Sequence, residues 1–210
     1  AAGGGVPAAE RPAAAPAPAW VFPFDKPPAP AEDGNQALAV NTEDGSVVYD
    51  VAFALVWAGD GPVDATNGAY AFASCTGCTA VAVGFQVVLV LGQADVVVPE
   101  NLSAAANYNC VDCLTYALAS QLVTTLDGPL SEAGMAELSA LWEQIAEFGR
   151  NLGDYPLSEI QGRLNGFKAQ ILDTIERDPG AGSGGSTDAG TGPTPGPTTA
   201  PEPGGTAAPE

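Results

Sequence analysis

Two Cys-x-x-Cys pairs, each followed by an apolar segment, constrain the fold of this chain more than any other feature. The pairs begin at Cys75 and Cys110, 35 positions apart, and a glutamine follows eight residues after each second cysteine, Cys78 and Cys113. This internal similarity predicts a repeated unit in which a cysteine turn leads into an apolar strand. Two copies are too few to predict a solenoid.

The cysteines have three candidate roles, and electrostatics bears on two of them. The chain has 25 acidic and 6 basic residues, and residues 27–149 contain no lysine or arginine. Four thiolates around a zinc ion carry negative charge that cations or many backbone donors usually offset, and the gap between the pairs exceeds the usual zinc-ribbon spacing. A thiol-disulfide redox site likewise needs a stabilised thiolate, which acidic surroundings such as Asp112 disfavour. A zinc-stabilised domain with four cysteine ligands and a redox protein are therefore alternatives.

Structural disulfides are the favoured interpretation, because they need only an oxidising compartment. Four cysteines allow three connectivities. The repeat indicates either two local bridges, Cys75–Cys78 and Cys110–Cys113, or cross-bridges between adjacent turns. The sequence does not choose between these, and it therefore predicts Cys75, Cys78, Cys110 and Cys113 as disulfide residues of open connectivity.

The ends of the chain differ in composition from its middle. Residues 1–34 are mostly alanine, proline and glycine, and residues 178–210 are rich in proline, glycine and threonine and have no large apolar side chain. Neither composition supports a core, so we expect both segments to be disordered. The aromatic cluster Trp20–Phe24 is the exception, and we expect it to dock on the domain. Residues 35–177 then form one domain of ordinary size.

Turn signals and apolar runs predict that this domain begins with strands. Asp44-Gly45 separates two apolar runs, a dipeptide typical of hairpins. The apolar stretch Val81–Val98 is interpreted as two strands around Gly92-Gln93, and Leu114–Leu126 as a further strand. The sequence therefore predicts an antiparallel β-rich region.

The apolar period becomes helical after Ser131, which is a suitable N-cap. A break at Gly149–Tyr155 separates two amphipathic segments, and the second has Glu159/Arg163 and Asp173/Arg177 spaced for ion pairs one helical turn apart. We expect an antiparallel two-helix hairpin. The predicted fold class is thus α+β.

Composition also restricts function. The acidic excess disfavours binding to nucleic acids, and no apolar stretch is long enough to insert into a membrane. The chain has no histidine, which removes the commonest general base and the usual nucleophile-activating partner. We therefore expect neither an enzyme nor a bound cofactor. The expected partner is an unknown protein or a cell-surface component.

Several segments resemble a domain found in actinobacterial proteins described as peptide zinc metalloproteases, in the soluble region after their membrane helices. The similar residues are Asn35–Asn41, Val48–Trp57, Ala69–Cys75 and Val83–Val90. The chain lacks the His-Glu-x-x-His motif of those proteases, so the resemblance transfers no catalytic or metal-binding residue. It implies an extracytoplasmic accessory domain. Together these observations predict a secreted or surface-tethered, non-catalytic structural or binding module stabilised by disulfides.

Overall fold

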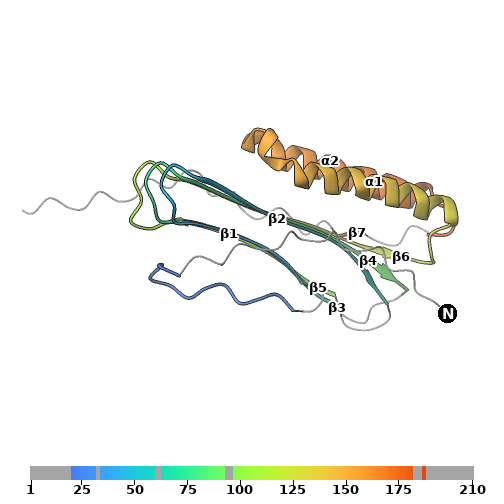
Figure 1. Cartoon of the computed structure of the whole chain (residues 1–210). Coiled ribbons are helices and arrows are strands. Elements are labelled where there is room, and N and C mark those ends of the chain that lie inside the picture. The colour runs from blue at the N-terminus through green and yellow to red at the C-terminus, as the bar shows by residue number, and fades with distance from the viewer. Residues whose placement is uncertain (1–19, 32–33, 60–62, 93–96, 182–185, 188–210) are drawn as a thin grey trace, which may run out of the picture.

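The computed structural model describes residues 20–31, 34–59, 63–92, 97–181 and 186–187 (Figure 1). In chain order the elements are β1 (Asn35–Asn41), β2 (Val47–Ala58), β3 (Val63–Ala73), β4 (Thr79–Leu91), β5 (Val97–Asn107), β6 (Leu114–Leu126), α1 (Glu132–Arg150), the 3₁₀ turn η1 (Leu152–Asp154), α2 (Leu157–Arg177) and β7 (Ser186–Thr187). Two sheets and the helix pair form three layers (Figure 1).

From β1 to β6, consecutive strands lie in different sheets. Strands β1, β3 and β5 form one sheet, and β2, β4, β6 and β7 form the other. Each strand–turn–strand unit is therefore an arch: arch 1 comprises β1 and β2, arch 2 comprises β3 and β4, and arch 3 comprises β5 and β6. The three arches stack, and every pairing between them is parallel. Only the short β7 pairs antiparallel, with β6.

The predicted antiparallel sheet is therefore wrong. Asp44-Gly45 does reverse the chain, and Gly45 has a positive φ of 69°, but the turn carries the chain into the second sheet instead of back along β1. The two strands around Gly92 are likewise separated into different sheets. A short turn signal specifies a reversal and does not specify whether the two strands then bond to each other.

The predicted repeat is confirmed by the strand register. Gln86 of β4 is paired with Gln121 of β6, as the superposed cysteine units require. Arch 1 is a third copy that the sequence analysis missed, because it has no cysteines. Asparagine identifies arch 1 as a copy of the repeat instead, since Asn35, Asn67 and Asn101 occupy the same register position in β1, β3 and β5.

The two sheets face each other through small side chains. Their shared core consists mainly of buried alanines and two cysteines: Ala37, Ala39, Ala52, Ala69, Ala71, Ala73, Cys75, Cys78, Ala80, Ala82, Ala117 and Ala119. Because these side chains are short, the backbones approach closely. At Gly84 an added Cβ would lie 2.7 Å from the carbonyl oxygen of Gly68 and 2.9 Å from Asn67 Oδ1.

A carboxamide ladder crosses this narrow core. Asn35 Nδ2 donates to Asn67 Oδ1, and Asn67 Nδ2 donates to Asn101 Oδ1, both at 2.8 Å. The same amides reach the opposite sheet, since Asn35 donates to the carbonyl of Ala52 and Asn101 to that of Ala119. Buried amides that satisfy one another in this way fix the register of the stack.

The predicted helix pair covers the other face of the β2–β4–β6 sheet (Figure 1). Large side chains of β4 and β6, such as Phe85 and Leu118, pack there with Ile145 and Ile160 of the helices. The expected N-cap is confirmed, because the Ser131 side chain accepts a hydrogen bond from the Gly134 amide. The two expected ion pairs within α2 are also present. Within the described residues, neither helix combines the length and the apolar character needed to cross a membrane.

Residues on both sides of the predicted domain pack against it. Phe22 is buried, and Trp20, Phe22 and Phe24 all contact the ring of Phe72 on β3, so the expected docking of the aromatic cluster is confirmed. At the other end, Ala181 is buried and accepts hydrogen bonds from the backbone after β6. Residues 1–19 and 188–210, where we expect disorder, lie outside the described residues.

Asp178 joins the end of α2 to the start of α1. Its carboxylate accepts hydrogen bonds from the backbone and hydroxyl of Ser131 and from the amides of Gly180 and Ala181. The Ser131 hydroxyl bond is the main cause that lowers the pKa of Asp178, with the backbone bonds adding to it against the opposing effect of burial. The ionised form is therefore the one that the fold stabilises.

We predict that Gly84→Ala destabilises the fold by about 1–3 kcal/mol, because the new methyl group forces the two sheets apart. The control is Gly162→Ala in α2, where an added Cβ meets nothing within 4 Å and alanine improves helix propensity. Urea unfolding would measure both free energies. Equal stability of the two variants would contradict close packing at Gly84.

We also predict that Asp178 contributes to acid sensitivity. Because the pKa of Asp178 is lower in the folded state, its ionised carboxylate stabilises the fold at a pH above the unfolded-state pKa of about 3.9. This stabilisation is lost as the pH falls through the folded-state pKa. Asp178→Asn should therefore be less stable than the wild type at pH 7 but lose less stability below about pH 4. Urea midpoints of both proteins across this range test it, and parallel curves would contradict it.

Candidate functional site: the stacked cysteine turns

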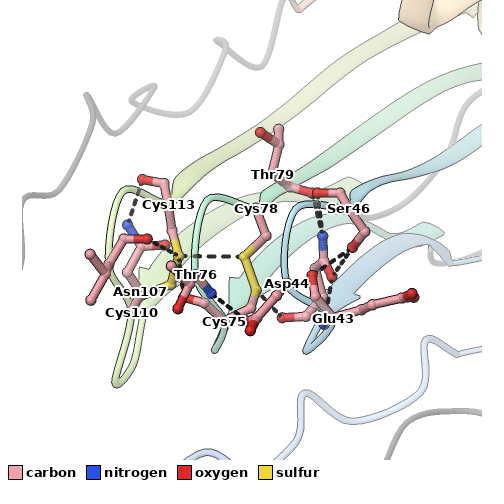
Figure 2. The surroundings of a disulfide bond; sticks show 12 residues. Glu43, Asp44, Ser46, Cys75, Thr76, Cys78, Thr79, Asn107, Cys110 and Cys113 are labelled. Carbon is pink, nitrogen blue, oxygen red and sulfur yellow. Dashed lines mark hydrogen bonds between the residues drawn. A yellow bond between two sulfur atoms is a disulfide. The ribbon is translucent and has the colours of Figure 1, made fainter.

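The turns of the three arches lie side by side, where the strands of the two sheets meet at one end (Figures 1 and 2). Backbone hydrogen bonds join neighbouring turns, from the Gly45 amide to the Thr76 carbonyl at 2.9 Å and from the Gly77 amide to the Val111 carbonyl at 2.8 Å. Thr76 and Val111 also form a parallel bridge. The arches are thus held in register at their turns as well as along their strands.

The cysteines of arches 2 and 3 form local bridges. Cys75 is joined to Cys78 and Cys110 to Cys113, so that no described cysteine is free. Of the two arrangements left open by the sequence, the structure has the local one. Stacking nevertheless brings the bridges together, because the four sulfur atoms lie within 4.8 Å of one another. The Sγ atoms of Cys78 and Cys113 are only 3.4 Å apart (Figure 2).

The two cysteine turns share one backbone requirement. The residue before each second cysteine has a positive φ, 64° at Gly77 and 54° at Asp112. Glycine adopts this conformation without cost, and aspartate is among the residues that tolerate it best. The third position of each Cys-x-x-Cys unit is therefore set by backbone geometry, which gives Asp112 a structural role.

Arch 1 replaces the disulfide with side-chain hydrogen bonds. Asn41 Nδ2 donates to the carbonyls of Ser46 and Thr79, while Asn41 Oδ1 accepts from the Ser46 hydroxyl and the Glu43 amide. Asp44 Oδ1 accepts from the Thr76 amide of the next turn at 2.7 Å. The sequence analysis placed Asp44 in a turn but missed the hydrogen bonds of Asp44 and Asn41. A usable signal was the asparagine that ends the first strand in both arch 1 and arch 3, Asn41 and Asn107.

The two bridges differ in access to solvent. Cys75 and Cys78 are buried, whereas Cys110 and Cys113 are half-buried beside Val111, which is 59% exposed. Carbonyl oxygens approach the sulfur atoms, with Asn41 O 3.2 Å from Cys75 Sγ and Cys75 O 3.0 Å from Cys113 Sγ. Oxygen lone pairs at these distances disfavour a thiolate and suit a disulfide or a neutral thiol.

A concave region lies between the helices, away from the cysteines. It is a cavity of about 250 Å³ lined by residues of α1 and α2, among them Glu137, Asp173 and Arg177. Arg177 pairs with both carboxylates, and its hydrogen bond is the main cause that lowers the pKa of Glu137. The one guanidinium of this cavity thus offsets part of the charge of its two carboxylates and links the two helices.

Comparison of the chain with protein-family models, with curated proteins and with solved structures finds no significant match. The resemblance to the soluble region of actinobacterial membrane proteins therefore stays a prediction from the residues. The functional interpretation depends on the geometry of the turns.

Local bridges close very short loops, so each should add little stability. The entropy model gives about 2 kcal/mol for a loop of this size and about 4 kcal/mol for a cross-bridge closing ~35 residues. We therefore predict that the double variant Cys110→Ser, Cys113→Ser loses about 2 kcal/mol in denaturant unfolding.

The matched variant Cys75→Ser, Cys78→Ser should lose more, because its hydroxyl groups replace buried sulfur atoms. A larger loss at Cys110 and Cys113 than at Cys75 and Cys78 would contradict the observed burial.

Proposed function

We propose that this chain is a non-catalytic structural or binding module that works outside the cytoplasm, with its arches fixed by two disulfides. The observation that carries the proposal is the stacking of the bridges, Cys75–Cys78 on Cys110–Cys113, at the turns of neighbouring arches. Each bridge fixes the local conformation of one turn, and the hydrogen bonds between turns transmit that order along the stack. Such bridges persist in an oxidising compartment.

A structural role accounts for the buried polar side chains. Asn35, Asn67 and Asn101 bond to one another and to backbone carbonyls, and Gln121 donates to Gln86 Oε1 at 2.7 Å. These buried carboxamide groups therefore use their hydrogen bonds to hold the two sheets together. The chain has no histidine, which removes the most frequent acid-base residue of enzymes.

A binding role is supported by apolar side chains exposed along arch 3. Val111, Leu102 and Leu114 are 59%, 47% and 37% exposed, and Val98 at the start of the same arch is 47% exposed. Val111 lies in the turn and Leu114 directly after it, and neighbouring exposed apolar groups are typical of interaction surfaces. The proposed partner is a protein or another cell-surface component, in keeping with an accessory domain of a membrane peptide metalloprotease system.

A zinc-stabilised domain with four cysteine ligands is the second candidate, and one observation favours it. Four sulfur ligands within 4.8 Å of one another are close enough to surround one zinc ion if all four are reduced. The nearby carbonyl oxygens and the lack of lysine and arginine in residues 27–149 count against four thiolates at this place. The same surroundings count against a thiol-disulfide enzyme.

Intact mass separates the candidates. We predict that the purified protein gains about 4 Da on reduction, because two disulfides take up four hydrogens. We also expect its thermal unfolding to be insensitive to a zinc chelator. An unchanged mass, with one bound zinc and unfolding by chelator, would replace the disulfide module with the zinc domain. Oxidised cysteines together with catalytic reduction of insulin would indicate the redox enzyme.

A further inference from the structure

We propose that the two bridges form a disulfide relay, in which reduction of the more accessible Cys110–Cys113 bridge passes inward and leaves Cys78 joined to Cys113. This inference rests on the oxidised state proposed above and adds a chemical property to the module. Its basis is the 3.4 Å separation of the Cys78 and Cys113 sulfur atoms, which belong to different bridges (Figure 2).

Access decides where reduction begins. Cys75 and Cys78 are 6% and 1% exposed, so an external thiol reaches that bridge poorly. Cys110 and Cys113 are half-buried at the outer arch, next to the exposed residues Val111 and Asp112. Because exchange needs contact between the attacking thiolate and a sulfur atom, the bridge of arch 3 is reduced first.

Proximity decides what happens next. The freed Cys113 sulfur already lies in contact with Cys78, and a free cysteine side chain can rotate about its Cα–Cβ bond to align with the Cys75–Cys78 bond. Surrounding carbonyl oxygens keep the thiolate fraction low, but a contact held by the fold replaces a bimolecular encounter and raises the effective concentration of the attacking group. The backbone bonds between the turns maintain that contact.

The exchange balances with one external dithiol as the reductant. An external dithiol first reduces Cys110–Cys113, and its own two sulfur atoms become a disulfide. The Cys113 thiolate then attacks Cys78 Sγ, the Cys78–Cys113 bond forms, and the Cys75–Cys78 bond breaks. Cys75 leaves as a thiolate and takes up a proton. In the oxidised protein Cys75 Sγ lies 3.2 Å from the carbonyl oxygen of Asn41, which can accept a hydrogen bond from the released thiol.

The product of this relay is a half-reduced protein whose arches are cross-linked. Cys78–Cys113 connects arch 2 to arch 3 directly, whereas the starting bridges each lie within one turn. A mild reductant therefore exchanges two local bridges for one bridge between arches and two thiols, Cys75 and Cys110. Loss of covalent order at the turns then requires a second equivalent of reductant.

The test uses the whole protein with one equivalent of dithiothreitol at pH about 8.5, where thiols are substantially ionised. After acid quenching and alkylation, peptide mapping locates the labels. We expect labels on Cys75 and Cys110 and a cross-linked peptide pair containing Cys78 and Cys113. Labels on Cys110 and Cys113, with Cys75–Cys78 intact, would overturn the relay. Failure to gain mass on full reduction would instead overturn the disulfides themselves.

Two single variants supply a matched comparison. Cys110→Ser leaves a free Cys113, and Cys113→Ser leaves a free Cys110, so both lose the same bridge but keep different thiols. We expect alkylation of Cys75 to be at least about tenfold greater in Cys110→Ser than in Cys113→Ser, since only the former keeps the attacking sulfur. Far-UV circular dichroism checks that both are folded, and equal Cys75 labelling in two folded variants would overturn the proposal.

Discussion

Close contact between two sheets, each built of parallel strands, is the constraint on which the rest of this structure depends. Alanine and glycine on the facing strands leave room only for short side chains, and the carboxamide ladder of Asn35, Asn67 and Asn101 bridges that gap. A slip of one residue in β1, β3 or β5 would place the amide of that strand on the other face of the sheet. Most of the large apolar side chains therefore lie on the far side of the second sheet, where the two helices cover them, and an aromatic cluster packs on Phe72 of the first sheet.

The exposed strand edges at the two ends of the stack, arch 1 and arch 3, are protected from further pairing in different ways. At arch 1, the Asp50 carboxylate accepts a hydrogen bond from the Leu38 amide of β1 at 2.6 Å, which occupies a donor on that edge. At arch 3, β5 contains Pro99, which has no amide hydrogen, and β7 covers part of β6. Charged side chains and prolines are common means of preventing edge-to-edge association. They limit the addition of further arches to a chain whose parallel pairing could otherwise continue.

Local patterns in the sequence predicted what is locally determined. The helices follow from apolar periodicity and from Ser131, and the strand Leu114–Leu126 was placed at its observed ends. The paired cysteine units indicated the repeat. Parallel pairing was missed because it is decided by contacts between residues more than 30 positions apart, as between Asn35 and Asn67. One usable sign was the nearly continuous apolar sequence of β4, since strands apolar on both faces are typical of parallel sheets.

The parallel stack also has a consequence for how the chain folds. Because adjacent strands of each sheet belong to different arches, each parallel ladder joins residues 32 to 35 positions apart, as with Asn35 and Asn67 or Gln86 and Gln121. The entropy of closing such loops must be lost before pairing returns any free energy, so folds of this kind form slowly. The local bridges do not shorten this search, because each constrains only its own turn. Once the ladders have formed, unfolding must break several of them together. A high activation barrier to unfolding is therefore expected to keep the module folded, in addition to its equilibrium stability.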